Sequence, residues 1–348
     1  MLTAPAQEAY SADAATAVRY LPSVPLDTYL RDVVPHSTVL RGVADFSRPG
    51  AELALSVLAT TVTEFDTDAT GRGDSYRTAQ KDASVRWTGA EQLLRLCAPN
   101  GSAVVLDILG GDGTLARALA EHGGPATAGI TLLTSDLSGE MIEQALAQGL
   151  PAMRQAADFL FVRESSVDAV LLAYGTHHIA PQDRPAAVRE ALRAVRPGGR
   201  VVLHDFDATS PMARFFTDVV HSHAPGGHDY PHFSRAELTE LFAAAGAPAR
   251  IHSVYDPLVV RGATAQEARR AMCAYVGHMY GVSALFSRLG EAASWKLLEN
   301  CFDHTDYLSG LEEASGFPVA PRIRAAGDGC FLAEVPRVSL VAVARKEG

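Results

Sequence analysis

Residues 104–118 read Val-Val-Leu-Asp-Ile-Leu-Gly-Gly-Asp-Gly-Thr-Leu-Ala-Arg-Ala, and this stretch decides the fold. The apolar run that ends at Asp107 predicts a strand, and the residues after the last glycine predict a helix. Between them, Gly110, Gly111 and Gly113 allow a tight turn and a close approach of a ligand to the backbone, where a Cβ would collide. A strand, a glycine-rich turn and a helix N-terminus together predict a nucleotide-binding corner.

The spacing of the glycines narrows the class of nucleotide site. A dinucleotide fingerprint needs Gly-x-Gly-x-x-Gly and a phosphate loop needs a closing Gly-Lys-Ser/Thr, and the segment has neither. It resembles motif I of class I S-adenosylmethionine (SAM) methyltransferases, Asp/Glu-x-Gly-x-Gly-x-Gly. In that resemblance Asp107 is the acid, Gly111 and Gly113 are the second and third glycines, and Leu109 replaces the first. Gly110 supplies flexibility one residue later; the alternative is an ordinary turn whose glycines serve packing.

Further motifs of this family follow in the expected order. An apolar run over 129–135 ends in Asp136, followed by Leu137. The resemblance makes Asp136 the acid that accepts hydrogen bonds from the two ribose hydroxyls. It likewise makes Asp158 the acid that reads the adenine amine, with Phe159 beside the ring.

The next segments complete the pattern of alternating strands and helices. Residues 167–172 predict the fourth strand, 185–195 a helix and 201–204 the fifth strand. The turn Arg-Pro-Gly-Gly-Arg over 196–200 is typical of the family. The resemblance therefore implies an α/β fold, the class I methyltransferase (Rossmann-like) seven-stranded sheet, with an N-terminal helical segment and a helical insertion between the last two strands.

The chain around this core is long enough for additional segments. Residues 250–260 predict the sixth strand and 339–344 the seventh, and the connection between them greatly exceeds ordinary loop lengths. Helical patterns over 265–280 and 285–302 favour a cap over the substrate pocket, with a dimerisation arm as the alternative. The expected organisation has four parts: an N-terminal helical lid or dimerisation segment at 1–97, the SAM-binding core at 98–262, the helical insertion at 263–325, and the final core strand at 326–348.

Composition excludes several other classes of protein. The net charge of −10 over 348 residues argues against a nucleic-acid surface. No apolar run of about 18 residues and no signal peptide is present, which predicts a cytoplasmic protein without a membrane partner. The four cysteines are scattered and match no zinc spacing. We expect a homodimer, as in many relatives of this family.

Titratable side chains gather where the strands are predicted to end. They are Tyr174, His177 and His178 after the fourth strand, His204 and Asp205 at the fifth, and His221, His223, His228, Tyr230 and His232 in the loop that follows. Ligands of such folds bind at the carboxyl ends of the strands, so these residues are expected to contact substrate. Two tyrosines from elsewhere complete the set: Tyr76, closing over the methionine part of SAM beside Tyr174, and Tyr280, contacting substrate.

Two chemical roles are open for the histidines. A general base titrating near neutral pH can take a proton from an acceptor hydroxyl, and His223 and His204, with His228 behind them, are the leading candidates. Metal binding is the alternative, but the histidine spacing is irregular, and we predict no metal site.

The expected substrate is a small aromatic molecule. The general layout resembles actinobacterial natural-product C-methyltransferases that act on hydroxylated aromatic amino acids, such as 3-hydroxykynurenine or tyrosine, in antibiotic biosynthesis. O-methylation of a phenolic natural product is the alternative. A non-catalytic SAM-fold binding protein, and a SAM-fold enzyme that has lost methyl transfer, are hypotheses from other classes.

Overall fold

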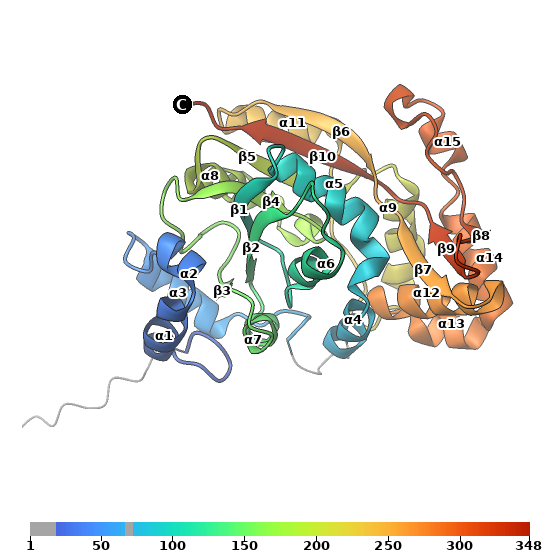
Figure 1. The fold of residues 1–348 in the computed structure, drawn as a ribbon, viewed down its shortest axis with the longest axis horizontal. Helices are drawn as coiled ribbons and strands as arrows, with labels where there is room; N and C mark the ends of the chain where they lie inside the picture. Colours follow the sequence, from blue (N-terminus) through green and yellow to red (C-terminus); the bar gives the residue numbers. More distant parts are fainter. Residues whose placement is uncertain (1–18, 67–71) are drawn as a thin grey trace, which may run out of the picture.

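A seven-stranded sheet forms the centre of the computed structural model, which describes residues 19–66 and 72–348 (Figure 1). Six strands are parallel, and β10 is inserted antiparallel between β5 and β6. In order across the sheet, the strands are β3 (Ala152–Arg154), β2 (Gly129–Asp136), β1 (Ser102–Asp107), β4 (Val167–Leu172), β5 (Val195–Phe206), β10 (Val338–Arg345) and β6 (Ala249–Tyr255). The predicted α/β class with a seven-stranded sheet is confirmed.

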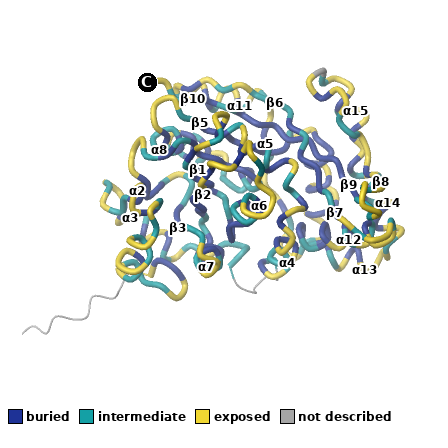
Figure 2. Tube along the Cα trace, viewed as in Figure 1, coloured by how far each residue is buried: buried dark blue, intermediate teal, exposed yellow. Residues whose placement is uncertain are grey.

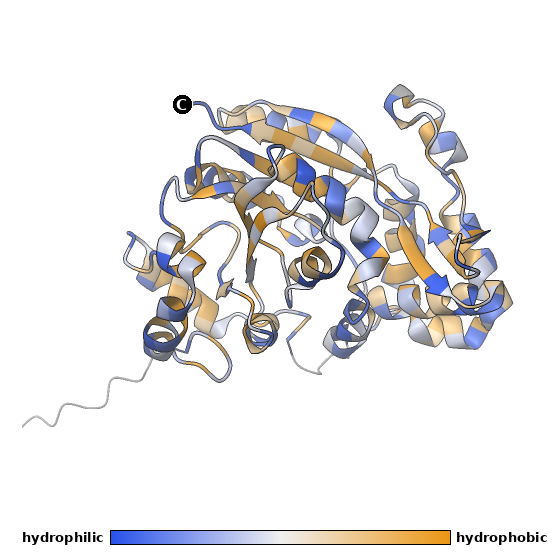
Figure 3. Cartoon of the chain, viewed as in Figure 1, coloured by the Kyte–Doolittle hydropathy of each residue, from blue (hydrophilic) through white to orange (hydrophobic). Residues whose placement is uncertain are grey.

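Burial explains why the central strands form. Strands β1, β2 and β4 are nearly continuous apolar runs, as expected where helices cover both faces of a parallel sheet. Figure 3 shows these strands as hydrophobic, and Figure 2 shows them as buried. The helices of the core are α5 (Trp87–Cys97), α6 (Thr114–His122), α7 (Gly139–Ala147), α8 (Arg184–Ala194), α9 (Pro211–Phe215), α10 (His221–His223) and α11 (Arg235–Ala244).

The N-terminal segment covers the β3 edge of the sheet. The Tyr20 hydroxyl donates to the carbonyl of Arg154 and the Tyr29 hydroxyl to that of Ala152, each at 2.7 Å. Both tyrosine side chains are buried in the main core, so this segment protects an edge that could otherwise pair with another chain. Its helices are α1 (Leu26–Thr28), α2 (Thr38–Val43), α3 (Ala51–Thr60) and α4 (Arg72–Gln80). Residues 1–18 of the predicted 1–97 segment lie outside the described residues.

The predicted sixth strand is two strands in two different sheets. Strand β6 ends at Tyr255, and after Asp256 and Pro257 the chain enters β7 (Leu258–Gly262) of a separate three-stranded sheet, β7-β9-β8. Proline lacks the N–H that a ladder needs, which ends the first strand. The other strands of this sheet are β8 (Arg322–Ala325) and β9 (Phe331–Val335).

This second sheet and the helices between its strands form a module whose hydrophobic cluster also includes residues of α4, β5 and α9. The helices are α12 (Ala265–Met279), α13 (Ser283–Leu289), α14 (Glu291–Cys301) and α15 (Thr305–Leu308). The module therefore extends over 258–335, wider than the predicted 263–325, and the predicted final segment contains β9 as well as the core strand β10. The helix predicted over 285–302 is interrupted at Gly290, whose φ of +76° favours glycine. Within the described residues, none of the helices has the length and apolarity to span a membrane.

Removing a large side chain from the module's core should destabilise the protein. Phe302 is fully buried, with its ring centroid 5.0 Å from that of Phe215 of α9. We expect Phe302→Ala to lower the free energy of unfolding by about 3–5 kcal/mol. Urea denaturation checks this, with Leu289→Ala, at a 40% exposed position of the same module, as control. Equal effects of the two substitutions would contradict the assignment of Phe302 to a packed core.

Candidate active site

A cavity of about 480 Å³ opens at the carboxyl ends of the central strands. Its wall includes residues that follow β1, β2 and β4, together with residues from α4, from the loop after α10 and from the end of α12. The site therefore lies where α/β sheets bind ligands. One end of the cavity is formed by the glycine-rich turn, and the other by aromatic side chains and histidines.

The glycine-rich turn presents its backbone to this cavity. Gly111 lines it, with a φ of +56° and open space at the position of a Cβ. Gly113 has a φ of +83°, and a Cβ there would lie 2.3 Å from Leu150 Cδ1. Gly110 packs behind the turn, where a Cβ would lie 2.9 Å from Asp107 Oδ2. These three positions therefore require glycine for conformation or close approach.

Two carboxylates lie at this end of the cavity. Asp136 lines it, and its oxygens accept hydrogen bonds from the backbone N–H groups of Gly111 and Ser138, both at 2.9 Å. Asp107 is buried immediately behind the turn. Burial raises the pKa of Asp136 to about 6 and that of Asp107 to about 7, where the charge of Asp136 adds to the effect.

The wall beyond Asp136 is mainly apolar. Leu137 and Met141 line the cavity, and Asp158 adds a carboxylate. Phe159 does not reach the cavity, because its ring lies under the guanidinium of Arg48, 4.2 Å from the ring centroid, and edge-on to Phe161. Leu137 and Met141 thus provide the apolar surface that the sequence assigned to Phe159.

These residues fit SAM. The Asp136 carboxylate is available to a diol, the open Cβ position at Gly111 leaves room for a ligand against the backbone, and Asp158 with Leu137 suits an adenine ring. Tyr174 and Tyr76 line the same cavity where it continues toward its other end. Tyr174 has a φ of +60°, a strained conformation that persists only where surrounding contacts hold it.

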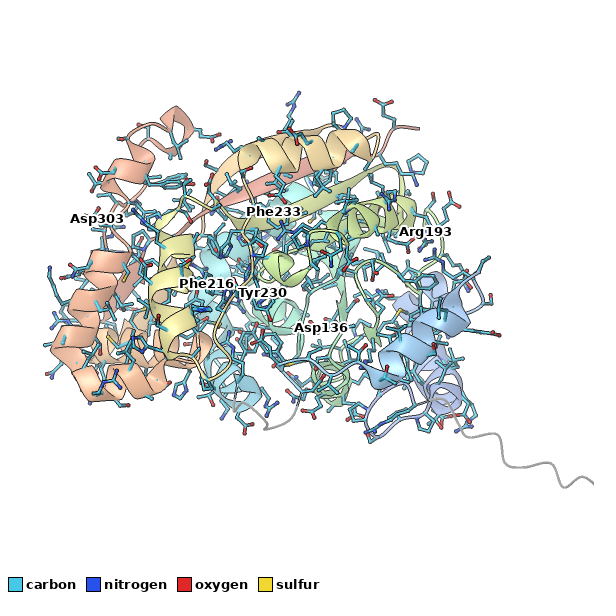
Figure 4. All side chains as sticks on the ribbon, turned by 180° about the vertical axis from the view of Figure 1, so that it is seen from behind. Asp136, Arg193, Phe216, Tyr230, Phe233 and Asp303 are labelled. Atoms are coloured by element: carbon cyan, nitrogen blue, oxygen red, sulfur yellow. The ribbon has the colours of Figure 1, made fainter. Side chains whose placement is uncertain are left out.

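The opposite end is aromatic. Phe206, Phe216, Tyr230 and Tyr280 all line the cavity, and they come from β5, the turn after α9, the loop after α10 and the end of α12. Figure 4 shows Phe216 and Tyr230 near the middle of the molecule, with Asp136 below them. Apolar and aromatic walls with a few polar groups are typical of sites for small molecules.

His177 lies at the boundary between this aromatic wall and a buried carboxylate. Its Nδ1 is 3.0 Å from Asp205 Oδ2, and its backbone N–H donates to the same oxygen at 2.6 Å. His232 Nδ1 approaches the other oxygen, Asp205 Oδ1, at 3.0 Å. Burial alone would raise the pKa of Asp205, but the adjacent His177 and His232 hold it well below its usual range. Asp205 is therefore an anion, and its contact with Nδ1 favours the His177 tautomer that carries a proton on that nitrogen.

Two further histidines surround His177. His228 Nε2 lies 3.3 Å from His177 Nε2, and its ring stacks on Phe216 with centroids 4.1 Å apart. His178 lines the cavity, with Nδ1 3.3 Å from Glu64 Oε1. Burial and the charge of His177 lower the pKa of His228 to about 3 and also lower that of His178. Both rings are thus neutral near pH 7, and His228 is able to share a proton with His177.

The structure does not bring the two leading base candidates of the sequence analysis to the cavity. His223 is exposed on the three-residue α10, outside the lining of the cavity. His204 is completely buried between Tyr174 and Phe206, with ring centroids 4.6 and 5.5 Å away, and its Nδ1 faces the backbone N–H of Tyr174. His204 lies in the buried part of β5, where neighbouring side chains cover it, whereas all three residues of α10 are outside the buried interior.

Several cavity residues escaped the sequence analysis. Arg72, Arg86 and Arg337 bring three guanidinium groups to the wall, and Arg337 is held by the buried Asp256, with Nη2 2.7 Å from Oδ2. The Tyr174 hydroxyl donates to the other oxygen of Asp256 at 3.2 Å. The Asp256-Pro257 pair, which interrupts an apolar run, was the one local signal in the sequence that could have indicated this part of the site. The three arginines follow no spacing pattern that would have indicated them.

In the part of the chain that the structure describes, two groups of side chains have ligand atoms close enough to hold a metal ion: His177, His178 and His228, and His177, Asp205 and His232. In the second group, both ring nitrogens already face Asp205 at hydrogen-bond distance. In the first, His177 and His228 contact each other through Nε2. Hydrogen bonds thus account for these contacts, and the sequence-based expectation of metal independence remains a prediction.

The glycine turn, the strand-end acids and the sheet order together define a class I SAM-dependent methyltransferase domain. Residues 79–248 match the family model described as a methyltransferase domain. This segment, just under half of the chain, is therefore similar to methyltransferase domains, and the residues that line the cavity fit SAM as the cofactor.

Curated relatives match about a third of the chain. A ubiquinone/menaquinone biosynthesis C-methyltransferase UbiE from Acidiphilium cryptum is 33% identical over 117 residues, which are 31% of this chain and 44% of the relative. A demethylmenaquinone methyltransferase from Beutenbergia cavernae is 32% identical over 120 residues, 32% of this chain and 43% of the relative. The chain therefore spans about half the length of the curated relatives it matches.

Solved structures with similar coordinates include the YcgJ protein from Bacillus subtilis, with 18% identity, a TM-score of 0.40, and coverage of 79% of this chain and 100% of that one. Another is phosphoethanolamine N-methyltransferase 2 of Haemonchus contortus, with 16% identity, a TM-score of 0.46, and coverage of 82% of this chain and 61% of that one.

Cofactor affinity should depend on the ionisation of Asp136. An ionised carboxylate accepts both ribose hydroxyls, so the affinity for S-adenosylhomocysteine should fall as the pH decreases through about 7 to about 6, where Asp107 and Asp136 gain protons. At neutral pH, Asp136→Asn should weaken binding by about 1–3 kcal/mol and reduce this pH dependence. Calorimetry over this range checks both statements. Unchanged affinity in the folded variant would contradict the ribose assignment.

Metal independence can be tested directly. Because hydrogen bonds already engage the histidine nitrogens, incubation with EDTA should leave the methylation rate unchanged. Elemental analysis of the purified protein provides the complementary measurement. A rate that EDTA abolishes and that zinc, iron or magnesium restores would show that one of the two histidine groups is a metal centre.

Proposed function

We propose that this protein transfers the methyl group of SAM to a small hydroxylated aromatic molecule, at a ring carbon next to or opposite the hydroxyl. The observation that carries the proposal is the His177–Asp205 pair, placed at the wall that the cofactor motif and the aromatic residues share. An acceptor ring would lie among Phe206, Phe216, Tyr230 and Tyr280.

The chain's own groups are suited to remove the hydroxyl proton. SAM supplies an electrophilic methyl group when bound. Asp205 holds His177 Nδ1–H, so Nε2 is the atom that takes the proton from the acceptor hydroxyl, and the carboxylate stabilises the imidazolium that results. The resulting oxyanion raises the electron density on the ring carbons ortho and para to it, which makes them nucleophilic. One of these carbons would form a bond to the methyl group as the bond from that group to sulfur breaks and S-adenosylhomocysteine leaves. Loss of the proton on the methylated carbon then restores the aromatic ring.

The neighbouring rings give the proton a further path. His228 Nε2 faces His177 Nε2 at 3.3 Å and the ring is neutral near pH 7, so a proton can be shared between the two. This contact also means that the acceptor hydroxyl must compete with His228 for Nε2. His228 thus remains a proposed participant, as the sequence suggested, whereas the role proposed there for His204 and His223 passes to His177.

Carbon is preferred over oxygen as the acceptor atom because the names of the relatives specify C-methylation in quinone biosynthesis. A hydroxylated aromatic amino acid remains the proposed type of substrate. O-methylation of a phenol would need the same deprotonation, so it is the second candidate. Mass spectrometry and NMR of the product from a panel of phenols, including tyrosine and 3-hydroxykynurenine, distinguish carbon from oxygen. SAM binding without any methylated product would favour a non-catalytic binding protein.

Loss of the base should lower turnover without affecting the cofactor. We expect His177→Asn to reduce kcat by about 10²–10⁴-fold, the usual contribution of a general base, and to leave the affinity for S-adenosylhomocysteine nearly unchanged. Steady-state kinetics with the phenol that the wild-type protein methylates checks this. His223→Ala, at an exposed position, is the matched control and should retain kcat. A large loss with His223→Ala and none with His177→Asn would return the role to the residue first suggested by the sequence.

A further inference from the structure

Arg86 differs from the other two arginines that line the cavity. Arg72 pairs with Glu64 at 3.7 Å and Arg337 with Asp256 at 2.7 Å. Among the described residues, no carboxylate lies within 4.0 Å of the Arg86 guanidinium, and its side-chain hydrogen bonds involve neutral groups only. Nη2 donates to Gln80 Oε1 at 2.6 Å, and the guanidinium also bonds the Tyr76 hydroxyl. A guanidinium has five donors, so most of its capacity is unused.

The surroundings of Arg86 are low in polarity. The guanidinium carbon lies 4.7 Å from the ring centroid of Tyr174, and its charge acts on the hydroxyls of Tyr76, Tyr275 and Tyr280. Tyrosines at ordinary pH are neutral, so they do not compensate the charge. Removing an unpaired cation from water is costly unless a ligand or a carboxylate compensates it.

A second observation lies beside Arg86. The side chain of Tyr275 is 7% exposed, and its hydroxyl has no hydrogen-bond partner among the described residues. Buried hydroxyls are almost always paired, so this donor is an exception that a ligand atom would explain. The charge of Arg86 acts on this same hydroxyl.

Arg86 lines the same cavity as the glycine turn and the aromatic side chains. Its guanidinium lies over the ring of Tyr174, which lines the cavity as well. An anionic group bound here would belong either to the amino-acid part of the cofactor or to the acceptor.

We propose that Arg86 binds a carboxylate of a ligand in this cavity. The proposal rests on the proposed function only in taking the cavity as the site of SAM and acceptor. A planar carboxylate matches the fork of guanidinium donors, which explains an arginine here better than a lysine. If the carboxylate is the acceptor's, the substrate is an aromatic acid or amino acid rather than a simple phenol.

Calorimetry with defined probes tests the cofactor source without requiring turnover. Arg86→Gln removes the charge and keeps an amide of similar length. If the cofactor carboxylate binds here, the variant should lose about 10- to 100-fold in affinity for S-adenosylhomocysteine. It should keep its affinity for 5′-methylthioadenosine, which lacks the amino-acid part. Arg86→Lys should lose less, and Arg95→Gln, at an exposed position of α5, should lose nothing.

The acceptor source is tested with tyrosine and tyramine, which differ by one carboxylate, in the presence of saturating S-adenosylhomocysteine. If the acceptor carboxylate binds here, the wild-type protein should prefer tyrosine over tyramine, and Arg86→Gln should abolish the preference while retaining the affinity for S-adenosylhomocysteine. The proposal is overturned if Arg86→Gln changes neither the affinity for S-adenosylhomocysteine nor the preference for tyrosine over tyramine. It is also overturned if the substitution lowers the affinity for 5′-methylthioadenosine as much as the affinity for S-adenosylhomocysteine. Because these are binding measurements, a failure to find any methylated product would not affect them.

Discussion

The ion pair between Asp256 and Arg337 joins the two sheets of the molecule. The chain leaves the core sheet at Asp256 and returns to it at Arg337. At these two crossings between the sheets, Asp256 and Arg337 are hydrogen-bonded to each other through both backbone and side-chain atoms. The Asp256 N–H donates to the Arg337 carbonyl, and Arg337 Nε donates to the Asp256 carbonyl, both at 2.9 Å. Both side chains are almost completely buried, so loss of either partner would leave an uncompensated charge in the interior.

This pair also positions parts of the cavity. Arg337 Nη1 donates to the Tyr280 hydroxyl at 3.1 Å, and Asp256 accepts the Tyr174 hydroxyl, so tyrosines from the module and from the core are fixed to one buried charge pair. Gly89 in α5 allows the approach, since a Cβ there would lie 1.8 Å from Asp256 Oδ1. The strained backbone of Tyr174 is thus held by contacts from three separate segments.

The sequence anticipated the residues at the glycine-turn end of the cavity more fully than those at the aromatic end, and the reason is physical. Asp107 and the glycines belong to one local unit of strand, turn and helix, and Asp136 ends the next strand along the chain, so their spacing carries their geometry. The strand order of the core follows from the same alternation of elements. By contrast, Arg86 and Arg337 are 251 positions apart in sequence, and both line one cavity only because the tertiary fold brings their segments together. No local pattern encodes such a meeting.

The histidines show the same limit at smaller scale. Their concentration over 204–232 includes His228 and His232, which lie beside His177, but alternation along β5 decides which side chain faces which way. His204 points into the layer under Tyr174, and the next residue, Asp205, points to His177 and His232. Two adjacent residues of one strand therefore perform different tasks, one filling the interior and the other orienting a histidine at the cavity.

The division between core and module has a consequence for specificity. The residues that fit SAM come from the core, whereas Met279, Tyr280 and Arg337 belong to the module or to the crossing that returns from it. Substitutions in the module can therefore reshape the acceptor wall while the glycine turn and Asp136 stay in place. The two crossings limit this freedom, because the buried charge of Arg337 requires Asp256 at its present position. The module residues that line the cavity can thus be substituted, while the Asp256–Arg337 pair keeps the module attached to the core in one position. Such an arrangement allows the acceptor wall to change while the cofactor site stays the same.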